Sequence, residues 1–176
     1  LNAAVLGANP YVQINSVGVG AGAFGTDSIA IGQTTNAITS DSIAIGSRAT
    51  VTTRSGIAIG RDARSVGGTV SGIAIGEEAN SGAAAVAIGF AARADGAGIT
   101  PAPTLVTSAV ALGSAAVASG GQTVAIGSSA RAGIGFDIND PFGALNPGFN
   151  IVTIGGDARV NVDNGTAIGG GSRVSG

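Results

Sequence analysis

Few side chains in this sequence could carry out acid–base or nucleophilic chemistry. Histidine and cysteine are both absent, so proton transfer would depend on aspartate and glutamate. Glu77 and Glu78 form the adjacent acidic pair, but neighbouring residues of a strand point to opposite faces, which would separate an acid from its base. The G-x-S-x-G turn of serine hydrolases does not occur. The sequence therefore predicts no catalytic residues, and we expect the protein not to be an enzyme.

Arginine is the second group of chemical interest, because it supplies all eight basic side chains. Five of the arginines share one position of the repeat described below: Arg64, Arg93, Arg131, Arg159 and Arg173. A row of guanidinium groups could contact acidic partners such as sulfated glycans, sialic acids or acidic protein patches. A charged face is also commonly only a solvated face. Both interpretations of this candidate contact surface stay open.

Two further groups of side chains could bind a partner or an ion. Phe136 and Phe142 lie in a segment rich in phenylalanine, where they could form an exposed contact patch or a small satellite core. Asp137, Asp140 and Asp157 carry the oxygen ligands that calcium prefers, but their spacing fits no known calcium loop. We predict no metal site and no cofactor, and we keep the two phenylalanines as candidate ligand contacts.

Three other features argue against common functions. Residues 20–25 match G-x-G-x-x-G, but a dinucleotide site needs a helix directly after the glycines, and a strand pattern follows here. The net charge of −2 gives no basic footprint for nucleic acid. The most apolar segment, residues 82–92, is about half as long as a membrane helix. We expect neither nucleic-acid binding nor direct membrane insertion.

A repeat organises most of the chain. Four-residue runs of the type Ile-Ala-Ile-Gly recur, and they close at Gly32, Gly46, Gly60, Gly76, Gly89, Gly113, Gly127, Gly155 and Gly169. The sequence numbers of successive closing glycines differ by 14, 14, 16, 13, 24, 14, 28 and 14, so the period is 14. We interpret the difference of 24 as one period with about ten extra residues. We interpret the difference of 28 as two periods with a degenerate middle coil.

The repeat predicts two short strands per coil. Glycine at a fixed position and β-branched residues oppose a coiled coil, and the apolar run alternates large and small side chains with the period of a strand. The third and fifth positions after the closing glycine are small or apolar, as in Ala49 and Val51, and should face inward. The arginine position lies between them and should face solvent. Stacked coils of this kind form a parallel β-solenoid, here of some eleven coils.

The composition indicates that one chain is incomplete. We expect Ile43 and Ile45 to fill a thin interior opposite Ala49 and Val51, and Ala44 to face outward. A strand that is apolar on both faces needs cover on both faces, so we predict an obligate homo-oligomer. The interface candidates are the middle alanines of the runs: Ala30, Ala44, Ala58, Ala74, Ala87, Ala111 and Ala125.

Residues 41–46, with the sequence DSIAIG, resemble the NSVAIG head repeats of YadA-like trimeric autotransporter adhesins. The resemblance covers roughly residues 11–176. It implies one head domain over residues 1–176, folded as a left-handed parallel β-roll and assembled as a homotrimer. It also implies display on the outer membrane of a Gram-negative bacterium. The implied function is binding to host extracellular matrix, cell-surface proteins or glycans, or other bacteria.

Two segments depart from the repeat, near residues 95–108 and 132–150, and we expect them to be loops on a rigid scaffold. The stalk and the membrane anchor of such adhesins are expected in other parts of a longer protein. Other functions remain to be compared with adhesion. The domain could be a purely structural spacer within a fibre. A solenoid acyltransferase would repeat every six residues and use a histidine, and an ice-binding solenoid would need regular ranks of threonine.

Overall fold

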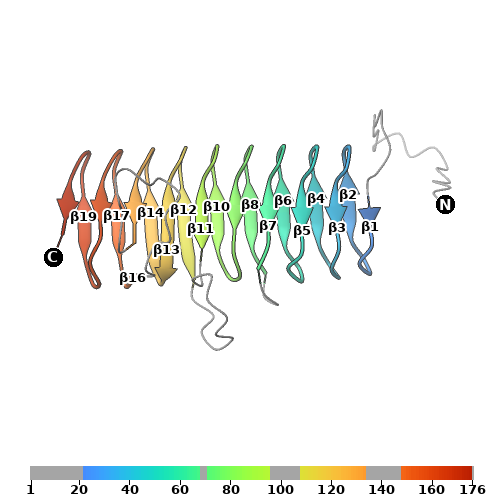
Figure 1. The fold of residues 1–176 in the computed structure, drawn as a ribbon, viewed down its shortest axis with the longest axis horizontal. Helices are drawn as coiled ribbons and strands as arrows, with labels where there is room; N and C mark the ends of the chain where they lie inside the picture. The colour runs from blue at the N-terminus through green and yellow to red at the C-terminus, as the bar shows by residue number, and fades with distance from the viewer. Residues whose placement is uncertain (1–21, 68–70, 96–107, 134–147, 176) are drawn as a thin grey trace.

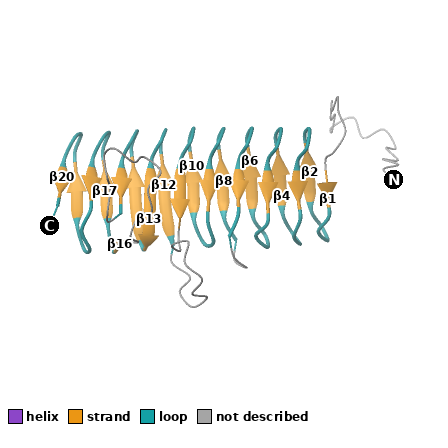
Figure 2. Cartoon of the chain, viewed as in Figure 1, coloured by secondary structure: helices purple, strands orange, loops and turns teal. Residues whose placement is uncertain are grey.

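The computed structural model describes residues 22–67, 71–95, 108–133 and 148–175. Within these ranges the chain consists of strands and turns, without a helix, and so without a helix suited to crossing a membrane. The strands stack in sequence order along one long axis (Figure 1). Each coil alternates two strands with two turns (Figure 2). The predicted all-β parallel solenoid is confirmed.

Two parallel sheets run along the stack. Sheet 1 contains β2 (Ile29–Ile31), β4 (Ile43–Ile45), β6 (Ile57–Ile59), β8 (Ile73–Ile75), β10 (Val86–Ile88), β12 (Ala109–Leu112), β14 (Thr123–Ile126), β17 (Val152–Ile154) and β19 (Thr166–Ile168). Sheet 2 contains β1 (Gly22–Ala23), β3 (Asn36–Ala37), β5 (Thr50–Val51), β7 (Arg64–Ser65), β9 (Asn80–Ser81), β11 (Arg93–Asp95), β13 (Val117–Gly121), β15 (Arg131–Ala132), β18 (Arg159–Val160) and β20 (Arg173–Val174). A further strand, β16 (Gly148–Phe149), pairs with β13.

The strand pairing decides how the two long intervals between closing glycines are built. β10 pairs directly with β12, so the interval from Gly89 to Gly113 is one coil with an insertion, as predicted. β14 pairs directly with β17, with Val124 opposite Val152, so the degenerate middle coil between Gly127 and Gly155 is wrong. This second interval is also one coil with an insertion, after which the chain rejoins the stack at β16. Sheet 1 accordingly has nine strands among the described residues, fewer than the predicted eleven coils.

The interior of the solenoid holds small side chains. Ala49, Ala63 and Val51 of the sheet 2 side are fully buried, which confirms that the third and fifth positions face inward. Opposite them lie the middle residues of the sheet 1 strands, such as Ala44, also at 0% exposure. The largest fully buried side chains are Ile151, Val51 and Val160.

The isoleucines therefore face outward, and the predicted orientation of the Ile-Ala-Ile strands is wrong. The reason is the width of the interior. The turn from Gly46 to Ala49 closes with a backbone hydrogen bond of 3.2 Å, and the ends of such a four-residue turn lie within about 7 Å. Ordinary packed sheets are about 10 Å apart, which leaves room for isoleucine. Here the side chains between the sheets are alanine, serine, threonine and an occasional valine, with Ile151 as the one buried isoleucine among the described residues.

The turn after sheet 1 requires glycine for two reasons. Gly60 has a φ of 133°, a conformation that side-chain-bearing residues avoid. A Cβ at Gly60 would also lie 2.4 Å from the carbonyl oxygen of Gly76 in the next coil. Two residues further on, each turn holds a left-handed residue that sequence reasoning missed, for example Asp62 with a φ of 59°. Each coil thus leaves sheet 1 through the same backbone geometry.

Candidate functional site

The outer face of sheet 1 is apolar and only half covered. Its two columns are formed by the residues on either side of the buried middle residue of each strand: Ile29, Ile31, Ile43, Ile45, Ile57, Ile59, Ile73, Ile75, Val86, Ile88, Val110, Leu112, Val124, Ile126, Val152, Ile154, Thr166 and Ile168. Their members are half-buried or exposed, with Ile88 at 39% and Ile154 at 36%. Successive strands pair in register, so the columns are continuous. We call them the aliphatic columns.

This arrangement corrects the predicted interface. The alanines proposed for it lie inside the single chain: Ala44, Ala58, Ala74, Ala87, Ala111 and Ala125 are fully buried, and Ala30 is partly buried against the same cluster. A side chain that is covered within one chain has no surface left for a partner. The apolar face that sequence reasoning inferred exists, but the aliphatic columns form it.

The arginine row lies on the outer face of sheet 2, as predicted. Strand register places its positions in the order Asn36, Thr50, Arg64, Asn80, Arg93, Val117, Arg131, Arg159 and Arg173. Arg64 and Arg173 are exposed, while the other three arginines are half-buried. The last three arginines are direct neighbours, and the first two are separated by Asn80.

The electrostatic surroundings differ along the row. Arg93 contacts the carboxylate of Asp95 at 3.1 Å, two residues along the same strand. Partial burial lowers the pKa of Arg131, and the adjacent charge of Arg159 lowers it further, although Asp157 opposes the shift. The row therefore contains one arginine held by an acid and a crowded cationic end.

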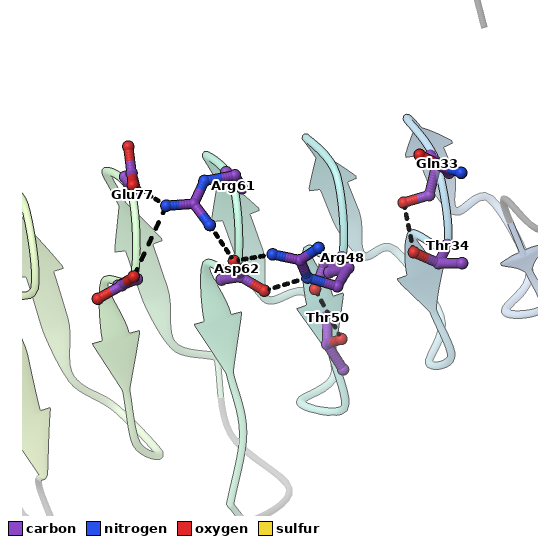
Figure 3. Close-up of polar contacts among 8 residues, drawn as sticks. Gln33, Thr34, Arg48, Thr50, Arg61, Asp62 and Glu77 are labelled. Carbon is purple, nitrogen blue, oxygen red and sulfur yellow. Dashed lines mark hydrogen bonds and ion pairs between the residues drawn. The ribbon is translucent and has the colours of Figure 1, made fainter. Parts of the chain in front are cut away.

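An ion-pair ladder borders sheet 2 at the turn after sheet 1 (Figure 3). Arg48 donates two hydrogen bonds of 2.6 Å to the carboxylate of Asp62 in the next coil. Arg61 contacts the same carboxylate at 2.9 Å and also pairs with Glu77. The hydrogen bond from Arg48 holds the pKa of Asp62 below its usual value. These contacts tie three successive coils together in register.

Glu77 and Glu78 belong to this ladder. They lie in the turn between β8 and β9, so the strand geometry assumed for them is wrong. Both are near Arg61, with Glu78 at 3.7 Å. Their nearest charged partner is thus a guanidinium group, and their role in the structure is ion pairing.

A polar groove runs between the ladder and the arginine row. It has a volume of about 450 Å³ and is lined by Arg48, Thr50, Asp62, Arg64, Glu78 and Asn80. The lining residues come from three coils, two from each, because they occupy the second and fourth positions after Gly46, Gly60 and Gly76. No single-sequence motif marks this groove. The sequence signal that could have revealed it is the recurrence, in three successive repeats, of polar residues at the second and fourth positions after the closing glycine.

Some candidate residues lie outside the described part of the chain. Phe136 and Phe142 are among them, so their role as ligand contacts remains a prediction. Asp137 and Asp140 are also outside it, whereas Asp157 is an exposed turn residue. Within the described ranges, no group of three or more acidic residues could hold a metal ion.

The geometry defines a class of protein: a parallel β-solenoid with aliphatic and charged side chains in rows on its outer faces. The family profile for the YadA head domain repeat matches residues 14–35, 40–63 and 107–130. These three matched segments support a YadA-like head domain in the chain. No curated protein matches it. YadA head domains are non-enzymatic modules of bacterial surface autotransporter adhesins, so the chain has an adhesin-type function.

Proposed function

We propose that the domain acts as a homotrimer, in which three copies cover one another's aliphatic columns. The observation that carries this proposal is the continuous apolar outer face of sheet 1. Large contiguous apolar patches on a soluble protein mark interaction surfaces, and parallel sheets are normally covered on both faces. Sheet 2, with its polar outer face, then remains on the outside of the assembly.

The oligomer is tested by mass measurement in solution. We expect the parent chain to sediment as a trimer at micromolar concentration. The double variant Ile45→Asp, Ile59→Asp places two charges in the columns, so it should give monomers or aggregates. Ile38→Asp is the control, because Ile38 is 48% exposed and lies outside the columns. A parent monomer, or a double variant with unchanged mass, would contradict the proposal.

The proposed activity is attachment of the bacterium to a host surface. The polar face of sheet 2 would contact host extracellular matrix, cell-surface proteins or glycans, with the arginine row and the segment containing Phe136 and Phe142 as candidate contacts. We place the domain on the surface of a Gram-negative bacterium, held in the outer membrane by another part of the protein. Rigid solenoids with variable outer faces suit such display, because substitutions there leave the small-residue interior intact.

Adhesion is tested with bacteria that display the domain. We expect them to attach to immobilised matrix or cultured host cells more than bacteria that display only the carrier. Soluble trimer added in excess should compete. If attachment is unchanged when the domain is removed, the domain is a spacer, and the adhesion proposal fails.

A further inference from the structure

The polar groove of sheet 2 contains an arginine without an acidic partner. Arg64 is exposed and lines the groove, and it takes part in none of the ion pairs within the described ranges. Arg48 differs, because its guanidinium group already donates two hydrogen bonds to the carboxylate of Asp62. Arg64 is therefore free to bind an external anion through two parallel hydrogen bonds.

Neutral polar side chains flank Arg64 on the neighbouring strands. Thr50 and Asn80 are its direct partners in the parallel register. The backbone N–H of Asn80 donates to the carbonyl oxygen of Ala92, but its side-chain amide makes no hydrogen bond within the described part of the chain. Strands lie about 4.8 Å apart, so the three side chains span about 10 Å along the rod. This is the length of a sugar unit or two.

The opposite wall of the groove supplies acceptors. Asp62 and Glu78 lie on the ladder side, where Arg48 and Arg61 fix their positions. Carboxylates accept hydrogen bonds from hydroxyl groups. The groove thus offers the guanidinium group of Arg64, neutral hydrogen-bond donors and two carboxylate acceptors. Its lining includes no apolar side chain.

We propose that this groove binds an acidic sugar, with its carboxylate or sulfate on Arg64 and its hydroxyl groups on Asn80, Glu78 and Asp62. This inference rests on the proposed adhesive function and names the ligand class for it. An acidic sugar carries both the anion and the several hydroxyl donors that the two walls require. A peptide fits less well, because peptide side chains bind through apolar anchors that this groove lacks. A shallow, open site of this kind predicts a dissociation constant on the order of 1 mM per groove. Simultaneous binding to three copies would lower the effective dissociation constant.

The competing location is the cationic end of the arginine row, where Arg131, Arg159 and Arg173 are neighbours. It would bind a long polyanion by charge alone. Its affinity should fall steeply with salt, whereas a bidentate contact inside a groove depends less on ionic strength. The two sites are far apart along the stack, so variants separate them.

The experiment is ligand-observed NMR titration of the full chain with three probes: sialyllactose, a sulfated lactose and lactose. The variants are Arg64→Ala, Arg64→Lys and Arg54→Ala. Arg54 is an exposed arginine in a turn outside the groove, so its variant removes the same charge elsewhere. Arg64→Ala should keep the parent's oligomeric state and unfolding midpoint, because the Arg64 side chain is exposed. It should weaken binding of an acidic probe by about tenfold or more. Arg64→Lys should recover part of this loss, and Arg54→Ala should bind as the parent does.

Binding of sialyllactose alone would identify a carboxylate sugar, and binding of sulfated lactose alone a sulfated one; either supports the proposal. Binding of lactose as strong as that of the acidic probes would overturn it, and so would undiminished binding by Arg64→Ala. A further variant carries three substitutions in the cationic end of the row, Arg131→Ala, Arg159→Ala and Arg173→Ala. If only this variant loses binding, the proposal is also overturned. A parent chain that binds an acidic peptide but neither acidic sugar would overturn it as well. Adhesion of displaying bacteria is measured in parallel. If they attach while the purified parent binds no acidic sugar, the groove proposal fails and the adhesive function stands.

Discussion

The glycine column predicts a stability difference that separates backbone strain from contact between coils. Gly60 and Gly67 both have positive φ, at 133° and 94°. A Cβ at Gly60 would lie 2.4 Å from the Gly76 carbonyl oxygen, whereas a Cβ at Gly67 would meet nothing within 4 Å. Substitution by alanine therefore imposes strain at both sites and a clash at only one.

The magnitudes follow from the structure. Strain at positive φ costs about 1–3 kcal/mol in either variant. At Gly60 the shortfall from ordinary contact at 3.4 Å is 3.4 − 2.4 = 1.0 Å. The coils must separate locally to relieve it, which lengthens the flanking hydrogen bonds from Gly76 N to Ile59 O and from Glu78 N to Arg61 O, now 2.8 and 2.9 Å. Two such bonds contribute about 1 kcal/mol each. We expect losses of about 3–5 kcal/mol for Gly60→Ala and about 1–3 kcal/mol for Gly67→Ala.

The assay is urea unfolding followed by circular dichroism, at one fixed protein concentration because assembly contributes to stability. The slope with urea should be the same in both variants, which shows that the same surface unfolds. Equal losses in the two variants would refute the reasoning, since the contact between coils would then contribute nothing. A loss confined to Gly67→Ala would refute it as well.

Two further predictions concern the ladder and the interior. Because Arg48 lowers the pKa of Asp62, this pair contributes stability above the unfolded pKa of the carboxyl group and loses it as pH falls through the lower folded value. The melting temperature of Asp62→Asn should thus lie below that of the parent near pH 6 and approach it below about pH 4. Asp41→Asn, in another exposed turn, is the control. A difference in melting temperature that persists at low pH would contradict this prediction. Ala58→Leu, in the filled gap between the sheets, should destabilise by about 1–3 kcal/mol or more in chemical unfolding. Ile57→Leu on the outer face keeps volume and should cost less than about 1.5 kcal/mol, so equal losses would count against the narrow interior.

Much of the fold follows from the sequence because strand geometry has few options. A fixed period with alternating side chains gives parallel pairing in register, and it correctly placed Ala49 and Val51 inside and Arg64 outside. The extra residues between Gly89 and Gly113 were also correctly interpreted as an insertion. In each case the local pattern alone decides the outcome.

The orientation of the Ile-Ala-Ile strands could not be decided in this way. Alternation shows that Ile43 and Ala44 face opposite sides, but both are apolar, so either could be buried. The gap between the sheets decides, and it depends on the four-residue turn at Gly46. Similarly, the long interval that ends at Gly155 fits two coils as well as one coil with an insertion. Only the direct pairing of Val124 with Val152 distinguishes them.

The candidate site depends on contacts that composition does not reveal. The repeat placed the five arginines in one row, but it did not show that Arg93 pairs with Asp95 or that Arg64 makes no ion pair within the described part of the chain. That difference arises at the second position of each turn. Asp62 and Glu78 are engaged there by Arg48 and Arg61 of the coils before them, which leaves Arg64 without a carboxylate.

The different roles of the two outer faces follow from the thin interior. Side chains as small as alanine bury little apolar surface, so each coil gains little from its own core. Much of the stabilisation must come from backbone pairing between coils and from cover over the aliphatic columns. Neither source depends on the outward residues of sheet 2. Arg64, Thr50 and Asn80 can therefore change with the ligand while the scaffold stays the same, which is the property that a surface-recognition module requires.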